Sequence, residues 1–180
     1  MLKIVVLSAT LLLCLAPGAA AQVQLDEPAA TRLKTQAEEC SRAFMEGDYE
    51  RLADYTHPKV VALAGGREKM AEFVRKGMAE IKAGGFEPLS YTTAEPSQVL
   101  KEGAQTYAVV PAKLRMRFKE TVHVSETFML GISGDGGKTW KFVSGASADP
   151  ANLKILFPAA AVARLKLPTV RHYPEDKKAP

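Results

Sequence analysis

One carboxylate of this chain lies where its surroundings could give it a chemical role. Residues 121–133 alternate as a β-strand does, and Glu126 falls on the face that carries Val122, Val124, Phe128, Leu130 and Ile132. Apolar surroundings make a carboxylate costly to ionise, so such a group can act as a general base or anchor a ligand. Two alternatives stay open: a β-bulge turns Glu126 outward, or an arginine or a tyrosine hydrogen-bonds to it.

Two tyrosines and a histidine could join Glu126 at a pocket. Tyr91 lies on an alternating strand and Tyr55 near the end of a short helix, and either phenol could donate a hydrogen bond to a carbonyl or anionic oxygen. Both also fit an ordinary, half-buried place in the core. His57 is expected at a helix end, where an imidazole could transfer protons at the mouth of a pocket. The candidate ligand-binding residues are therefore Tyr55, His57, Tyr91, Glu126 and Phe128, with Glu126 as the catalytic candidate.

No metal or cofactor is expected. The three histidines do not have the spacing of a metal site on one helix face, and Cys40 is the one cysteine left if residues 1–21 are removed. Cys40 falls on the apolar face of a helix, which favours a buried, unreactive thiol over an intermolecular disulfide. Gly137-Lys138-Thr139 is similar to the end of a P-loop, but position 132, where that motif needs glycine, is isoleucine.

Apolar periodicity predicts that helices occupy the first part of the chain. Residues 29–46 form one apolar stripe, and Gly47 ends that helix. Asp48 then caps a short second helix. Residues 60–64 are a short apolar run that favours a strand. After two glycines, a third helix has a predicted buried face made of Met70, Phe73, Val74, Gly77 and Ile81.

From residue 89 onward the apolar period changes to two, which predicts strands. Residues 104–119 and 121–133 are the long ones, and a last strand covers 138–143. Asp149 then caps a short final helix, and residues 166–180, rich in proline and charge, are predicted to be a flexible tail. Helices followed by an antiparallel meander predict the α+β class, with N-terminal helices packed on a curved antiparallel sheet.

The charge pattern argues against a nucleic-acid partner. The net charge of +4 comes from 24 basic and 20 acidic residues, which is too balanced for nucleic-acid binding. A basic stripe follows the first long strand, at Lys113, Arg115, Arg117 and Lys119. Alternation alone produces such a stripe on a solvated sheet face, although an anionic partner or a dimer contact also fits it.

Residues 133–140, Ser-Gly-Asp-Gly-Gly-Lys-Thr-Trp, fit a turn between two strands, because their glycines can adopt a positive φ. This string resembles the Asp-box, Ser-x-Asp-x-Gly-x-Thr-Trp, at every fixed position. In sialidase-type propellers, the Asp-box is a structural hairpin turn away from the active site. One copy in 180 residues therefore implies a hairpin and not a propeller.

The order of the predicted elements resembles the nuclear transport factor 2-like superfamily. The match comprises a long first helix, a second helix opened by Gly47-Asp48-Tyr49-Glu50-Arg51-Leu52, a short strand, a third helix and a meander, over residues 29–145 of a domain at 22–165. The resemblance implies a cystatin-like cone with a central pocket, often dimeric through its sheet. Members include isomerases, cyclases, dehydratases and binding modules without activity, and this chain lacks the inward-facing strand aspartate that catalytic members often use.

Residues 1–21 are predicted to be a secretory signal peptide. Lys3 precedes an apolar stretch over 4–15 that is too short to span a membrane, and Ala19-Ala20-Ala21 fits the small-residue rule for cleavage. Cleavage after Ala21 would yield a secreted or periplasmic protein without a transmembrane segment.

These observations predict an exported domain that binds a small apolar or amphipathic ligand, or a protein partner, in a pocket. A homodimer through the sheet is a second expectation. The alternative function is an isomerase or cyclase that transfers a proton next to a carbonyl, with Glu126 as the base and Tyr91 or Tyr55 as the donor.

Overall fold

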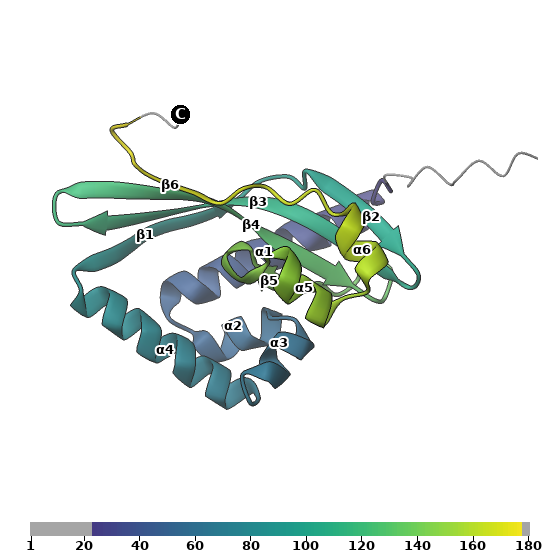
Figure 1. Ribbon diagram of the computed structural model, residues 1–180, viewed down its shortest axis with the longest axis horizontal. Helices are drawn as coiled ribbons and strands as arrows, with labels where there is room; N and C mark the ends of the chain where they lie inside the picture. The colour runs from purple at the N-terminus through teal and green to yellow at the C-terminus, as the bar shows by residue number, and fades with distance from the viewer. Residues whose placement is uncertain (1–22, 178–180) are drawn as a thin grey trace, which may run out of the picture.

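The computed structural model describes residues 23–177. The predicted signal peptide and its cleavage site lie outside these residues, so export stays a prediction. Helices pack with a curved antiparallel sheet that forms a half-barrel (Figure 1), which confirms the predicted α+β class. The helices are α1 (Glu27–Glu46), α2 (Tyr49–Tyr55), α3 (Pro58–Leu63), α4 (Arg67–Ala83), α5 (Pro150–Leu156) and α6 (Ala159–Arg164). The strands are β1 (Phe86–Thr93), β2 (Gln98–Glu102), β3 (Gln105–Phe118), β4 (Thr121–Ser133), β5 (Lys141–Ser144) and β6 (Arg171–Pro174).

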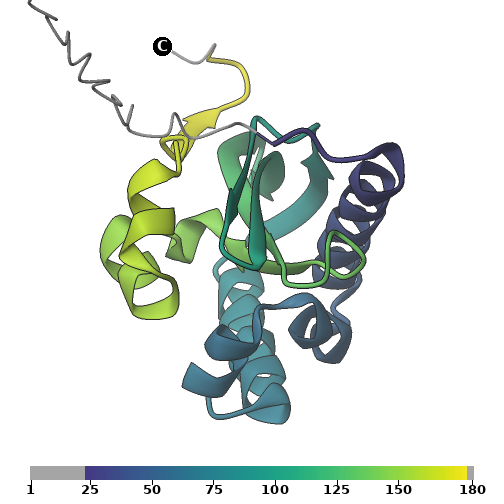
Figure 2. The same cartoon turned by 90° about the vertical axis from the view of Figure 1, so that its right-hand side faces the viewer.

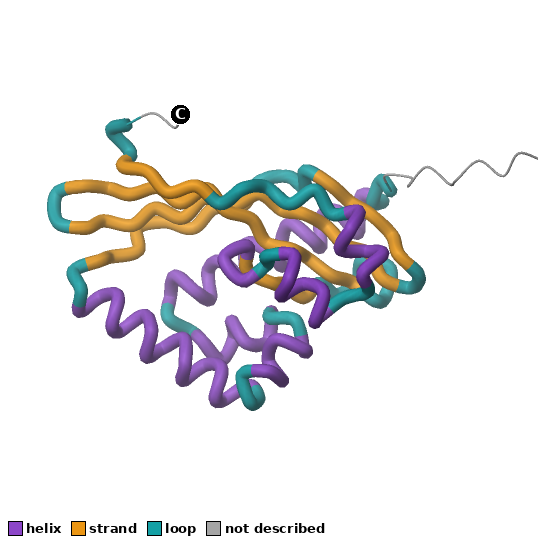
Figure 3. The backbone as a smooth tube through the Cα atoms, viewed as in Figure 1, coloured by secondary structure: helices purple, strands orange, loops and turns teal. Residues whose placement is uncertain are grey.

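The long hairpin of β3 and β4 forms the centre of the sheet, and short strands complete each side of it (Figure 3). One half of the hairpin pairs with β2 and β5, and we call it the proximal half. The other half pairs with β1 and β6, and we call it the distal half. All of these pairings are antiparallel.

Helices cover both faces of the proximal half (Figure 2). On the face that we call inner, α1 packs Leu33 against Val110 and Met129. On the outer face, α5 and α6 bury Leu153 against Phe128, within a larger apolar cluster. Because both faces are buried here, this half of the sheet holds most of the core.

Capping residues set the helix ends as the sequence predicts. The Asp26 carboxylate accepts from the Ala29 amide at 2.7 Å at the start of α1, and Gly47 ends that helix with a φ of 76°. Asp48 accepts from the Arg51 amide at 3.0 Å and begins α2. Asp149 caps α5 in the same way. In the described part of the chain, no helix is both long and apolar enough to cross a membrane.

Three predictions about elements are wrong. Residues 60–64 are not a strand, because Pro58 begins α3 and the run lies in that helix or just after it. On α4, Ala71 and Met78 are buried, whereas Phe73 is 75% exposed. The segment after residue 165 is not a flexible tail over its described length, since β6 pairs with β4. Leu165, Leu167 and Val170 also pack against the outer apolar cluster.

The Asp-box-like string forms the turn that the sequence predicts, and this turn docks on α1. Asp135 accepts from the Lys138 and Thr139 amides at 3.0 and 2.9 Å and from the Ser133 hydroxyl at 2.8 Å. These hydrogen bonds hold the pKa of the Asp135 carboxyl well below its ordinary value. The Arg32 side chain donates to the Gly137 carbonyl at 3.0 Å. The turn is therefore a structural joint between the sheet and the first helix.

Candidate functional site

The five residues predicted to share a pocket lie on both faces of the sheet. Tyr55 and Tyr91 pack against the inner cluster. Phe128 belongs to the outer cluster, and the His57 ring meets Phe157, which belongs to the same cluster, edge-on. Glu126 lies opposite Lys113 on the outer face of the distal half. The structure therefore does not bring the five side chains together.

Glu126 has polar neighbours instead of the apolar surroundings expected for it. The Tyr173 hydroxyl of β6 donates to its carboxylate at 2.8 Å, and the Lys113 ammonium is 4.0 Å away. Its side chain is 39% exposed. The apolar residues of this face, such as Phe128, are covered by α5 and α6 only in the proximal half. Of the alternatives left open by the sequence, the structure contains the hydrogen bond from a tyrosine to Glu126.

His57 is a structural residue at the start of α3. Its Nδ1 accepts from the Lys59 amide at 3.3 Å, and its ring meets Phe157 edge-on with centroids 4.9 Å apart. Burial, with a smaller contribution from the Lys59 charge, lowers the pKa of His57. The imidazole is therefore held neutral inside the fold and does not stand at a pocket mouth.

The two tyrosines differ in what their hydroxyls bind. The Tyr55 hydroxyl donates to Glu39, which also faces the Arg51 guanidinium, so it ties α2 to α1. Among the described residues, the Tyr91 hydroxyl has no hydrogen-bond partner, and it is not sealed from solvent. Its ring meets Phe44 edge-on with centroids 5.7 Å apart, and burial is the main cause that raises the pKa of Tyr91.

Tyr91 borders a set of side chains that sequence analysis did not select. We call this set the distal inner surface. Every member is partly buried, and Phe86 stacks on Phe118 with ring centroids 4.3 Å apart. His123 lies near Phe86, with centroids 6.3 Å apart. The set comprises Phe86, Pro88, Tyr91, Leu114, Met116, Phe118, His123 and Ser125, which the strand register places on the inner face.

The signal for this surface was present in the sequence. Residues 119 and 120 form a two-residue loop in which Lys119 has a φ of 53°. That loop pairs Phe118 with Thr121 and fixes the register along the whole hairpin, so Lys113 faces Glu126 and Leu114 faces Ser125. Counting outward from the loop would have placed Glu126 on the charged face.

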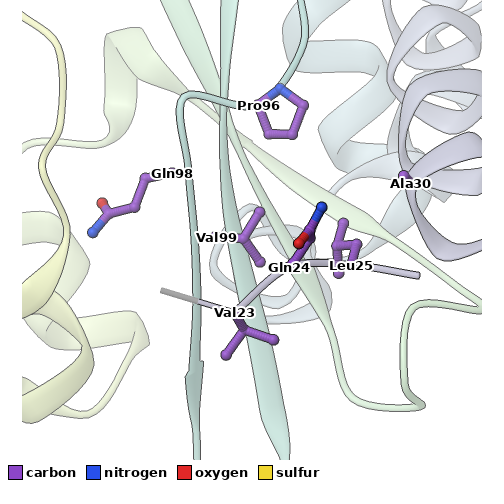
Figure 4. A pocket seen from close by; sticks show the side chains of 7 residues that line it. All are labelled: Val23, Gln24, Leu25, Ala30, Pro96, Gln98 and Val99. Carbon is purple, nitrogen blue, oxygen red and sulfur yellow. The ribbon is translucent and has the colours of Figure 1, made fainter. Parts of the chain in front are cut away.

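A hollow of about 460 Å³ lies elsewhere, between the segment before α1 and β2 (Figure 4). None of the five candidate residues lines it. The Gln98 side chain at its rim is already bonded to the Arg164 carbonyl and the Lys166 amide, at 3.0 and 2.7 Å. The hollow borders the first described residue, Val23. Its lining comprises Val23, Gln24, Leu25, Ala30, Pro96, Gln98 and Val99.

The described residues form no metal site, and comparison with known proteins assigns no family. Within residues 23–177, no group of three His, Cys, Asp or Glu side chains could hold a metal ion. Comparison of the chain with known protein families, curated proteins and solved structures finds no match. The resemblance to the nuclear transport factor 2-like superfamily therefore stays a prediction, whereas the α+β half-barrel comes from the structure itself.

Proposed function

We propose that this protein binds a small apolar or amphipathic molecule on the distal inner surface. The observation that carries the proposal is the Tyr91 hydroxyl, which has no hydrogen-bond partner among the described residues and borders apolar side chains outside the buried clusters. The hydroxyl is not sealed from solvent, so a ligand can reach it, and a free donor beside apolar side chains is typical of a ligand site.

The apolar side chains of this surface support the same proposal. Leu114, Met116 and Phe118 lie on one line along β3, and Phe86 stacks on the last of them. Each is only partly buried, so a ligand that covers them removes apolar area from water. Such cover contributes at most about 1 kcal/mol for each of these partly buried side chains, before the cost of association.

The alternative isomerase or cyclase receives no support from Glu126. The carboxylate lies on the outer face, bonded to Tyr173, and the distal inner surface is on the other side of the sheet. Pairing of two copies through the sheet stays a prediction. In the proximal half α5 and α6 already cover the outer face, which leaves only its charged distal half for such a contact.

Titration with N-phenyl-1-naphthylamine, an uncharged dye that fluoresces in apolar sites, tests the proposal. We expect saturable binding that Leu114→Asn weakens by about tenfold, because an amide replaces an apolar contact worth about 1.4 kcal/mol. Lys113→Asn is the matched control, since the neighbouring residue faces the opposite side. It should leave the affinity within about twofold.

Circular dichroism and thermal unfolding show whether both variants keep the fold. If Leu114→Asn proves unstable, Met116→Gln replaces it, because Met116 lies on the same surface. Absence of saturable binding by the unaltered protein contradicts the proposal. Equal affinities of the Leu114 and Lys113 variants contradict the location of the site.

A further inference from the structure

We infer that the distal inner surface takes uncharged amphiphiles that carry an acceptor oxygen, such as an ester or a ketone, in preference to anionic or cationic ones. This selectivity rests on the binding proposed above and adds the chemical class of the ligand. The Tyr91 hydroxyl is the donor for the acceptor oxygen. The selectivity for uncharged ligands is inferred from the position of the charged side chains, which the strand register places on the outer face of the sheet.

The strand register sends the cations of β3 to the outer face. Lys113, Arg115 and Arg117 each lie there beside a carboxylate, at 4.0, 2.7 and 3.0 Å. Their partners are Glu126, Glu175 and Glu87 respectively. These cations are therefore both neutralised and on the wrong side to meet a ligand on the inner face.

The distal inner surface itself has no Asp, Glu, Lys or Arg among its eight residues. Tyr91 and His123 are its titratable members, and the buried thiol of Cys40 lies close to Tyr91. The Lys119 ammonium lies over the Phe118 ring, 5.3 Å from its centroid, at the end of the surface away from Tyr91. Desolvating a charged head group at the Tyr91 end would bring no opposite charge in return, which makes binding of an ion there costly. An uncharged head group avoids that cost.

Tyr91 supplies a hydrogen-bond donor next to α1, and Ser125 lies in the same row of the sheet, beyond Leu114. Burial raises the pKa of Tyr91, so the phenol stays protonated at neutral pH and acts as a donor. A ligand oxygen that accepts this hydrogen bond pairs a group that the fold leaves unpaired. The side chain meets Phe44 of α1, which places the head group at the α1 end of the surface.

The apolar part of the ligand would then extend along β3. Leu114 lies opposite Tyr91, followed by Met116 beside Pro88 and Phe118 beside Phe86. These three rows span roughly 13 Å at the usual rise of a strand, which accommodates an extended chain of about ten carbons. A decanoyl ester therefore matches the surface in length and in its acceptor oxygen.

Two matched pairs of probes test charge selectivity on the full protein. N-Phenyl-1-naphthylamine and 1-anilinonaphthalene-8-sulfonate share one ring system and differ by a sulfonate. We expect the uncharged dye to bind at least about tenfold more tightly. Methyl decanoate should displace it, whereas decanoate at pH 8 and the same concentration should not. Equal affinities for the charged and uncharged members of both pairs overturn the selectivity and leave the proposed function standing.

Tyr91→Phe tests the hydrogen bond. It should weaken methyl decanoate by about tenfold and leave N-phenyl-1-naphthylamine, which has no acceptor oxygen, within about twofold. Tyr55→Phe is the control, because the Tyr55 hydroxyl is already bonded to Glu39. An unchanged ester affinity in Tyr91→Phe overturns the role of this hydroxyl.

Two further outcomes are distinguishable from these. No binding of the uncharged dye by a monomer overturns the proposed function together with the selectivity. No binding accompanied by a concentration-dependent dimer, seen by size-exclusion chromatography with light scattering, shows that a second copy covers the surface and likewise overturns both.

Discussion

Neighbours decide what each ionisable residue of this chain can do, and His57 is the clearest case. Its imidazole is buried against Phe157 and accepts from the Lys59 amide at the start of α3. Burial lowers the pKa of His57, so the folded protein binds a proton there less readily than the unfolded chain does. The contribution to stability is therefore complete above the unfolded value of about 6.5 and is lost as the pH falls below it.

His57→Asn tests this linkage. Asparagine keeps an oxygen that can cap α3 but does not titrate, so the variant should lose less unfolding free energy than the unaltered protein between pH 7.5 and pH 5. Urea unfolding at the two pH values measures the difference. His172→Asn, at an exposed position, is the control and should follow the unaltered protein. An identical pH dependence in His57→Asn would show that burial of this imidazole is not the cause.

Glu126 illustrates where reasoning from single residues stops. The alternation of β4 correctly places it on the face of Phe128 and Leu130. That face changes character along its length, because α5 and α6 cover only the proximal half. The extent of their cover depends on tertiary packing, which alternation within one strand does not contain.

At the scale of elements, the Asp-box-like turn fits closely against α1. Gly137 has a φ of 84°, and a Cβ built on it would lie 2.6 Å from the Cβ of Ala29 on α1. Gly136 has a similar φ of 74°, but a Cβ built there would meet nothing within 4 Å. Substitutions at these two neighbouring glycines therefore distinguish the effect of backbone strain from the effect of close packing against α1.

Gly137→Ala should lower the free energy of unfolding by about 2–4 kcal/mol, because it adds a clash with α1 to the strain of a left-handed backbone. Gly136→Ala should lower it by about 1 kcal/mol, from strain alone. Urea unfolding of both variants measures the two values. Equal losses would mean that the turn moves away from α1 at little cost.

Helix-capping residues and apolar periodicity predicted some helices and strands of this chain correctly and others wrongly. Asp26, Gly47 and Asp149 occupy helix ends as their chemistry requires, so local rules suffice there. The run at 60–64 is too short for its periodicity to separate a strand from a helix, and Pro58 decides for the helix. The buried face of α4 was predicted wrongly at Phe73, because its packing partner is α2 and not a wide sheet surface.

At the scale of the whole molecule, the segment after α6 closes one side of the sheet. β6 pairs with residues 123–126 of β4, and the Glu175 amide donates to the Val122 carbonyl at 2.8 Å. Arg115 also holds Glu175 through two hydrogen bonds of 2.7 Å. Proline and charge predicted a mobile segment here, since composition does not reveal a free strand edge at which such a segment can pair.

Deletion of residues 171–180 tests how far β6 protects the sheet. Hydrogen exchange should accelerate by at least about tenfold at those amides of 122–126 that β6 covers, while residues 129–132, paired with β5, should keep their protection. Glu175→Gln is the control, because it removes an exposed ion pair but keeps the strand. Unchanged exchange in the deletion variant would contradict a stable β6.

The connectivity of the sheet also has a consequence for folding during synthesis on the ribosome. Arg32 meets Gly137, which is 105 residues further along, and β6 is added to β4 by almost the last residues described. A ribosome therefore has to release residue 137 before the turn can dock on α1, and residues 171–174 before β4 gains β6. Nascent chains will expose this edge of β4 until residues 171–174 emerge, so the sheet is completed well after its central hairpin has been made.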